Sequence, residues 1–270
     1  MTFLVTNDDG FYAEGICVLK EQLLKDGHTV YVMAPSENRS AVSHGMTFST
    51  LEFIQISQNE WSCSGKPVDC VLAALSGSIF PKKIDAVLSG INAGANIGTD
   101  VVYSGTCAAA RQAVLQGVPG IAFSLQTVGK AYTSKDFDIT SYYDIRDKRK
   151  FFYEPMASFA SKNIETLVSI CRLSSPKAFV SVNALSLPYY KGVDFCRTLS
   201  NRQYKDSIDL NKDKMQNESN VFQSSFLGSA PVSSEEEDSD FYSVIHGNVA
   251  VSLINAEPSA CSVDGIKFSL

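Results

Sequence analysis

Short apolar runs alternate with stretches of helical periodicity along the first half of the chain. Each run is short and is bounded by glycine, proline or polar residues, as expected of a buried strand. Strands that alternate with helices form right-handed βαβ units, in which neighbouring strands are parallel. The pattern therefore predicts an α/β fold with a mostly parallel sheet. The strands are predicted at residues 3–6, 29–34, 84–88 and 120–125.

The helices are predicted from apolar side chains that recur every three or four residues. Gly27 stands where a left-handed cap would end the first helix, and Pro67 suits the first turn of the second. A third helix is predicted from Gly105 or Thr106 to a stop near Gly117. The apolar positions of the first, second and fourth helices are Ile16, Leu19, Leu23 and Leu24, then Val71, Leu72 and Leu75, then Met156, Phe159, Ala160, Ile164, Leu167, Val168 and Cys171.

Two segments interrupt this alternation. Residues 46–64 alternate loosely and contain Trp61, so we expect a hairpin excursion outside the parallel sheet. Residues 126–149 are polar with scattered aromatics, which indicates a surface connection. Strand character returns at residues 178–182 and 248–254.

Residues 192–240 are charged and serine-rich, and they include an acidic run from Glu235 to Asp238. The segment is too long and too polar to pack inside the core, yet it contains aromatic side chains that a simple linker would lack. An isolated two-stranded projection is only marginally stable in water. We therefore expect a projecting hairpin arm that packs on a partner subunit, with the acidic run exposed at its base. The aromatics are Phe195, Tyr204, Phe222 and Phe226.

Composition limits the function classes. The chain has 270 residues, of which 44% are apolar, and we expect one α/β domain over residues 1–270. A net charge of −6 argues against nucleic acids or an anionic membrane as partners. The 7 cysteines occur without a Cys-x-x-Cys pair, which indicates reduced thiols. Neither a signal-peptide pattern nor an apolar run of about 18 residues is present, so we expect a cytoplasmic protein.

The first predicted strand runs directly into Asn7, Asp8, Asp9 and Gly10. Open α/β sheets bind ligands at the carboxyl ends of their strands, and a bend at Gly10 would let both carboxylates reach one site. Adjacent carboxylates repel each other, and a divalent cation such as Mg²⁺ or Mn²⁺ would neutralise them. The alternative is an ordinary solvated turn, since Asp and Gly are common turn residues.

Further polar loops are predicted at the same edge of the sheet. Ser40 follows the second strand and is a candidate third oxygen ligand, or else a loop serine bonded to local backbone. Residues 89–98 are rich in glycine and asparagine, which permits a ligand to approach the backbone closely. The helix that begins near Gly105 presents free N–H groups and the positive end of its dipole at this edge, and both favour the binding of a phosphate group.

Several motifs occur in a fixed order along the chain: Asn7-Asp8-Asp9-Gly10, Asn38-Arg39-Ser40, Gly65-Lys66-Pro67-Val68-Asp69-Cys70, Ser89-Gly90-Ile91-Asn92-Ala93-Gly94-Ala95-Asn96 and Tyr103-Ser104-Gly105-Thr106. Together they resemble the SurE family of metal-dependent 5'-nucleotidases. The match covers most of residues 1–125 and continues more weakly through 183–188 and 240–253. The family usually has proline where Ala95 stands and commonly glutamate where Gln112 stands.

The resemblance implies a Rossmann-like three-layer fold with an extended hairpin arm and a C-terminal strand segment, assembled as a homodimer or homotetramer. It implies one divalent cation per subunit, Mg²⁺ or Mn²⁺. It also implies hydrolysis of nucleoside 5'-monophosphates, with 3'-monophosphates and short polyphosphate as further substrates. The family's metal ligands fall on Asp8, Asp9, Ser40 and Asn92, and its phosphate-binding positions on Asn7, Asn96, Ser104, Gly105 and Thr106.

The expected mechanism is metal-assisted hydrolysis of a phosphomonoester. Asp8 and Asp9 are the expected catalytic residues, because they hold the cation and one of them accepts a proton from water. One alternative is a phosphatase like the haloacid dehalogenases, in which Asp8 or Asp9 is the nucleophile, although those enzymes have Asp-x-Asp rather than adjacent aspartates. The other alternative is a metal- or nucleotide-binding protein without catalytic activity.

Overall fold

The computed structural model describes residues 1–127, 151–175, 177–200, 207–209, 225–227 and 236–258. The surface connection predicted at 126–149 and most of the predicted arm lie outside these residues. The elements follow in the order β1 (Thr2–Thr6), α1 (Glu14–Lys25), β2 (Thr29–Pro35), β3 (Phe53–Ser57), β4 (Glu60–Cys63), α2 (Pro67–Ser76), β5 (Ala86–Ala93), η1 (Gly98–Val102), α3 (Gly105–Leu115), β6 (Gly120–Gln126), α4 (Tyr153–Leu173), β7 (Ala178–Leu185), β8 (Val193–Cys196), β9 (Ser207–Asp209), β10 (Ser225–Leu227), α5 (Asp240–Ile245) and β11 (Val249–Asn255).

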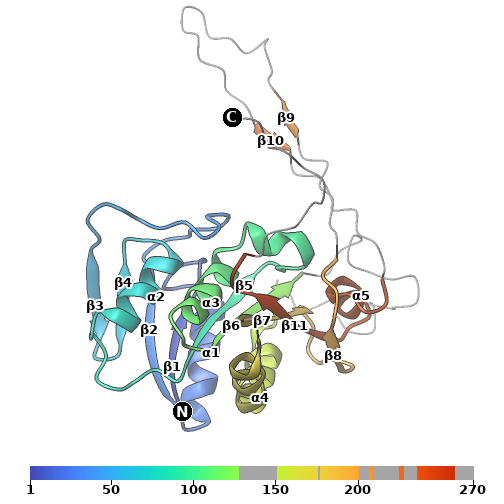
Figure 1. Ribbon diagram of the computed structural model, residues 1–270, viewed down its shortest axis with the longest axis horizontal. Coiled ribbons are helices and arrows are strands. Elements are labelled where there is room, and N and C mark those ends of the chain that lie inside the picture. Colours follow the sequence, from blue (N-terminus) through green and yellow to red (C-terminus); the bar gives the residue numbers. More distant parts are fainter. Residues whose placement is uncertain (128–150, 176, 201–206, 210–224, 228–235, 259–270) are drawn as a thin grey trace, which may run out of the picture.

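One sheet of 9 strands forms the centre of the molecule, in the order β3-β4-β2-β1-β5-β6-β7-β11-β8 (Figure 1). The strands from β4 through β7 in this order are parallel, whereas β3 and β11 pair antiparallel with β4 and β7. The chain leaves β1 towards β2 on one side and later returns to β5 on the other. Open α/β sheets generally bind ligands at such a reversal, outside the carboxyl ends of the strands.

Helices cover both faces of this sheet, because successive strand side chains point to opposite sides. Phe3 and Val5 lie in one apolar cluster with residues of α1 and α4. Leu4 pairs in register with Tyr31, and both lie in a second cluster with residues of α2 and α3. The predicted three-layer, mostly parallel α/β fold is therefore confirmed.

Two predictions about the sheet were wrong. The hairpin within residues 46–64 forms, but its second strand, β4, pairs in parallel with β2 and so belongs to the main sheet. The strand predicted to end at Leu88 continues to Ala93, because Asn92 pairs with Ser124 after a register shift. Residues predicted as the start of a glycine-rich loop are thus the end of a strand, which fixes their backbone.

Smaller corrections concern side chains and the predicted arm. Leu24 was predicted to face the core of α1 but is 49% exposed. The start of the arm predicted at 192–240 is the edge strand β8, which pairs in parallel with β11. Strands β9 and β10 pair antiparallel with each other outside the main sheet. Residues 236–238 of the acidic run are exposed, as predicted.

The cysteines in the described part of the chain are free thiols, and most of them are buried. Among the helices of that part, none combines the length and the apolar composition needed to cross a membrane.

Candidate active site

Asp8 is held at the end of β1 by the first turn of α3. Its side chain is only 3% exposed, and Thr106 binds both carboxylate oxygens: Oγ1 donates to Oδ1 over 2.6 Å, and the backbone N–H donates to Oδ2 over 3.2 Å. Burial raises the pKa of Asp8 to about 6, which the Thr106 hydroxyl opposes and the charge of Asp9 increases. The carboxylate is thus fixed in orientation while its negative charge remains poorly solvated, as in a site that receives a cation.

Gly105 allows α3 to approach Asp8 this closely. A Cβ atom at Gly105 would lie 2.8 Å from both Cβ and Oδ2 of Asp8, and 3.2 Å from Cγ2 of Val42. These separations are too short for a side chain, so any substitution would displace Asp8. The close approach also brings the positive end of the α3 dipole against the carboxylate.

Asp9 is less buried and is held from the other side by β5. The Ala93 N–H donates to Asp9 Oδ2 over 2.9 Å, and this bond opposes the rise in the pKa of Asp9 that burial causes. The neighbouring Asn92 donates its Nδ2 to the Gly94 carbonyl over 2.7 Å. Since the amide nitrogen is engaged, Oδ1 is the atom with which Asn92 can bind a cation.

Ser40 lies on the loop after β2, which is tied to the carboxylate turn through its backbone. The Arg39 N–H donates to the carbonyl oxygen of Asp8 over 2.7 Å, and the Ser40 N–H donates to Asn38 Oδ1 over 2.9 Å. Ser40 itself is exposed. The structure therefore brings all the predicted metal ligands to one edge of the sheet, with Ser40 adjacent in sequence to a residue that binds Asp8.

The predicted phosphate-binding residues fall into two groups. Ser104, Gly105 and Thr106 lie at the N-terminus of α3, where Ser104 Oγ caps the helix by accepting the Cys107 N–H over 3.0 Å. Asn7 is fully buried and closes the carboxylate turn, since its Nδ2 donates to the Gly10 carbonyl over 2.8 Å. Its amide is thus engaged by the turn itself in this structure.

Asn96 is likewise engaged within the protein. Its Nδ2 donates to Ser124 Oγ over 2.8 Å, and its backbone N–H donates to Asn183 Oδ1 over 2.8 Å. The sequence pattern did not predict Ser124 or Asn183 as supports of this loop. The signal was present as polar residues within otherwise apolar strands, but it does not reveal the partner.

A second contact that the sequence analysis missed joins the Ser40 loop to α3. His44 Nε2 lies 2.9 Å from Gln112 Oε1, and Ser43 Oγ donates to the Val102 carbonyl over 2.7 Å. Gln112 had been noted only as a departure from the family pattern. Through its contact with His44, Gln112 helps to hold the loop that carries Ser40.

The donor set fits a hard divalent cation. Asp8, Asp9, Ser40 and Asn92 offer two carboxylates, a hydroxyl and an amide oxygen, which is the kind of shell that Mg²⁺ or Mn²⁺ prefers. Burial raises the pKa of both carboxyls, so a cation would stabilise the ionised pair. Within the described residues, no group of 3 or more His, Cys, Asp or Glu side chains is placed to hold a metal ion.

Comparisons with known proteins agree with this geometry. Residues 3–206 match the family model described as Survival protein SurE. A Treponema pallidum protein named 5'-nucleotidase SurE is 42% identical over 205 residues, which cover 74% of this chain and 98% of that protein. A Haemophilus influenzae protein of the same name is 35% identical over 264 residues, covering 96% of this chain and 93% of that protein.

A crystal structure of the SurE protein from Aquifex aeolicus superposes with a TM-score of 0.72 at 26% identity, covering 96% of this chain and 95% of that one. The chain therefore belongs to the SurE family.

Proposed function

We propose that this protein is a 5'-nucleotidase that hydrolyses nucleoside 5'-monophosphates with the help of one divalent cation, Mg²⁺ or Mn²⁺. The observation that carries the proposal is the pair Asp8 and Asp9, held between the N-terminus of α3 and the end of β5. Membership of a family whose relatives are named 5'-nucleotidase SurE supports phosphatase activity on nucleotides. Nucleoside 3'-monophosphates and short polyphosphate are proposed as further substrates.

The residues of the site fall into groups with different tasks in this proposal. Asp8, Asp9, Ser40 and Asn92 hold the cation, which supplies a Lewis acid for phosphate oxygens and for water. One of the two aspartates also accepts a proton from the attacking water. The N–H groups at the start of α3 favour the charge on the phosphate, and we assign Ser104 and Asn96 to the same end of the site.

The contacts of Asp8 support hydrolysis by water rather than attack by a carboxylate. A nucleophilic aspartate needs an oxygen that can approach phosphorus in line. Both oxygens of Asp8 are instead fixed by Thr106. Both aspartates are also proposed cation ligands, and a carboxylate that binds a metal is a poor nucleophile. We therefore expect no covalent phospho-aspartate, and trapping one in an acid-quenched reaction would contradict this part of the proposal.

The test of the proposed activity is phosphate release from AMP by the purified full chain with Mn²⁺ or Mg²⁺. Activity should disappear after exhaustive chelation and return when either cation is added back. Hydrolysis that survives chelation would contradict the metal site. Nucleotide binding without any phosphate release would show that the protein binds but does not catalyse.

We also propose that the protein is cytoplasmic and forms a homodimer or homotetramer through the segment at 192–240. The support is the edge strand β8, on which Val193 is 54% and Phe195 is 57% exposed. An edge strand with exposed apolar side chains is suited to pairing with another chain. Deletion of residues 205–234 should lower the mass measured by light scattering, and an intact chain that is already monomeric would contradict the arm.

A further inference from the structure

Asp240 is a buried carboxylate far along the chain from the catalytic aspartates. It is the first residue of α5, which lies beside β8 towards one end of the sheet (Figure 1). Only 1% of the residue is exposed. Burial of an ionised carboxylate is costly unless hydrogen bonds replace the lost water. The partners of Asp240 therefore indicate what its burial achieves.

The two oxygens of this carboxylate accept three backbone N–H groups. Oδ1 accepts the N–H of Ser200 over 2.8 Å and that of Phe241 over 2.9 Å. Oδ2 accepts the N–H of Gly98 over 2.7 Å, from a residue 142 positions away. Hydrogen bonds to an ionised acceptor are stronger than those between neutral groups. Asp240 thus joins α5 to two other segments of the chain.

The start of α5 is capped without the bond to Gly98. The Ser239 hydroxyl is the N-cap group and accepts the Tyr242 N–H over 3.1 Å. Within α5, the Asp240 side chain binds only the N–H of its neighbour Phe241. The bond from Gly98 to Oδ2 therefore adds nothing to the cap, and its effect falls on the loop that contains Gly98.

This loop lies between two residues that we assign to the phosphate end of the site. Gly98 follows Asn96 by two positions and begins η1, after which Ser104 caps α3. Its φ of 58° is left-handed, as the turn into η1 requires. The buried side chain of Ile97 lies in one apolar cluster with Phe241 of α5. Helix α5 thus holds the turn through both a polar and an apolar contact.

The Asn96 side chain is directed by the backbone that carries it. Asn183 holds this backbone from both sides, because its Oδ1 accepts the Asn96 N–H over 2.8 Å and its Nδ2 donates to the Asn96 carbonyl over 3.2 Å. One N–H of the Asn96 amide donates to Ser124 Oγ over 2.8 Å. An amide has two such donors, so the second can serve a ligand. Its direction depends on the backbone at 96–98, which Asp240 holds at Gly98.

We propose that Asp240 is a positioning residue of the nucleotidase site. Through Gly98 it fixes the loop so that the second N–H of Asn96 points at a phosphate oxygen of the substrate. The inference rests on the proposed function and extends it to a residue that binds neither the cation nor the substrate. A donor that is misplaced by about 1 Å can cost about 10²-fold in rate.

Asp240→Asn tests this role with little change in shape. The amide has one acceptor oxygen, and turning its nitrogen to Gly98 loses one hydrogen bond, whereas the opposite orientation loses two. The variant should therefore release Gly98 and keep the bonds to Ser200 and Phe241. Asp238→Asn, an exposed residue of the same segment, is the matched control and should change nothing.

The measurements are calorimetric binding of inorganic phosphate in Mg²⁺ and steady-state hydrolysis of AMP by the full chain. Asp240→Asn should bind phosphate about tenfold more weakly and lose about 10- to 100-fold in kcat/KM. Mg²⁺ binding measured without phosphate should stay within about twofold, because Asp8 and Asp9 are not disturbed. A folded Asp240→Asn variant that binds phosphate like the control would overturn the proposal.

A double variant separates positioning from a purely structural role. In the Asn96→Ala background, Asp240→Asn should cause no further loss of phosphate binding or of kcat/KM, since no side chain remains to be directed. Losses that multiply would show that Asp240 does not act through Asn96. Thermal melts check folding. If Asp240→Asn does not fold, Asp240→Ser takes its place, with the same losses expected and unchanged phosphate binding contradicting the role.

The phosphate measurement keeps this proposal distinct from the proposed activity. Wild-type protein that binds phosphate but does not hydrolyse AMP would contradict the nucleotidase, while the phosphate affinities of the variants would still decide the role of Asp240. Wild-type protein that binds no phosphate would contradict both.

Discussion

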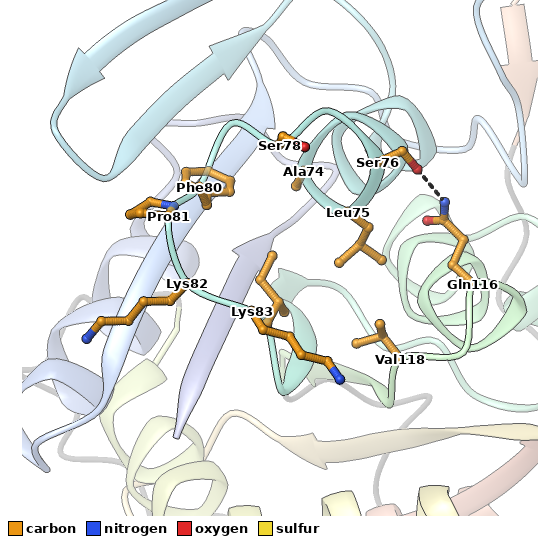
Figure 2. A pocket seen from close by; sticks show the side chains of 11 residues that line it. Ala74, Leu75, Ser76, Ser78, Phe80, Pro81, Lys82, Lys83, Gln116 and Val118 are labelled. Carbon is orange, nitrogen blue, oxygen red and sulfur yellow. Dashed lines mark hydrogen bonds between the residues drawn. The ribbon is translucent and has the colours of Figure 1, made fainter.

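The two edges of the parallel sheet differ in charge and construction. At the carboxyl edge, Asp8 and Asp9 are fixed by N–H and hydroxyl donors of Thr106 and Ala93. At the amino edge, a cavity between the last turn of α2 and the loop that leads into β5 is bordered by the long exposed side chains of Lys82 and Lys83 (Figure 2). Helix α3 connects the two edges. Its first turn binds Asp8, and its C-cap residue, Gln116, lines the cavity.

The difference follows from the topology of the fold. Right-handed βαβ units place helix N-termini at the carboxyl edge of the sheet and helix C-termini at the amino edge. Backbone N–H groups at the first edge can hold anions in fixed positions. The second edge offers mainly backbone carbonyls, so positive charge there must come from flexible lysines. Rigid positioning, which catalysis requires, is therefore available at the carboxyl edge, whereas adaptable binding suits the amino edge.

Asp8→Asn tests the catalytic edge most severely. Removal of this charge should lower kcat about 10²- to 10³-fold, because fixed electrostatic contributions of this kind are worth about 3 to 4 kcal/mol. Steady-state AMP hydrolysis with saturating Mn²⁺ measures the loss. Asp238→Asn, an exposed residue of the acidic run, is the control and should retain full activity. Equal kcat in the two variants would place the chemistry elsewhere.

The same variant should reveal the cost of charge burial in the metal-free protein. Burial raises the pKa of Asp8 from its ordinary value of 3.8 to about 6, so the folded state binds this proton more tightly than the unfolded state. Stability from the protonated carboxyl is thus present below about pH 4 and is lost as pH rises through about 6. The difference corresponds to about 3 kcal/mol.

Urea unfolding in chelator measures this cost at several pH values. Asp8→Asn should match the wild type near pH 4 and exceed its free energy of unfolding by up to about 3 kcal/mol at pH 8. If the free energy of unfolding depended on pH in the same way in both proteins, burial would not raise the pKa of Asp8. Added Mn²⁺ should stabilise only the wild type strongly.

A pair of glycine substitutions compares the two ends of α3 directly. Gly105→Ala places Cβ 2.8 Å from Asp8 Oδ2 and should lower kcat/KM about 10- to 100-fold through displacement of the carboxylate. Gly117→Ala meets no atom within 4 Å but has φ of 78°, so it should cost about 1 kcal/mol of stability and leave activity unchanged. Kinetics and thermal melts on both variants provide the comparison. Similar kinetic losses in both would contradict the special role of Gly105.

Thr106→Val gives the smallest of these effects. The substitution keeps the size of the side chain and the backbone N–H but removes the hydroxyl that donates to Asp8 over 2.6 Å. In the metal-free protein this bond lowers the pKa of Asp8, so its loss should raise that pKa and move the pH profile of activity at limiting Mn²⁺ to higher pH, because a protonated carboxyl does not bind the cation. Activity at neutral pH should fall about tenfold. The exposed Thr198→Val should leave the profile unchanged.

Local sequence patterns were sufficient for most elements of the α/β core, although helix α5 and strand β8 were not predicted. The run from Phe3 into Asp8 and Asp9 predicted a buried strand that ends in a charged turn, and β1 ends at Thr6. Gly27 was predicted to end the first helix, and it follows α1 with φ of 84°. These predictions hold because periodicity and turn preferences are properties of neighbouring residues.

Predictions failed where strand pairing between distant segments decided the outcome. β4 joined the sheet because its backbone pairs with β2, and β5 continued through Asn92 because β6 lies beside it. Neither pairing leaves a signal in the sequence of one strand. Most of the segment at 192–240 lies outside the described residues, and its role as an arm stays a prediction.

The sequence alone determined most of the succession of strands and helices in the core, the family, and the identity of the residues proposed to hold a cation, because these depend on local pattern and short motifs. The tertiary structure decided what those residues contact: Thr106 binds Asp8 across 98 positions, and Asn183 supports Asn96 across 87. It also decided that a cationic cavity forms behind the catalytic edge. Contacts of this range depend on the order of strands in the sheet, which hydrogen bonding between segments fixes only when the whole chain folds.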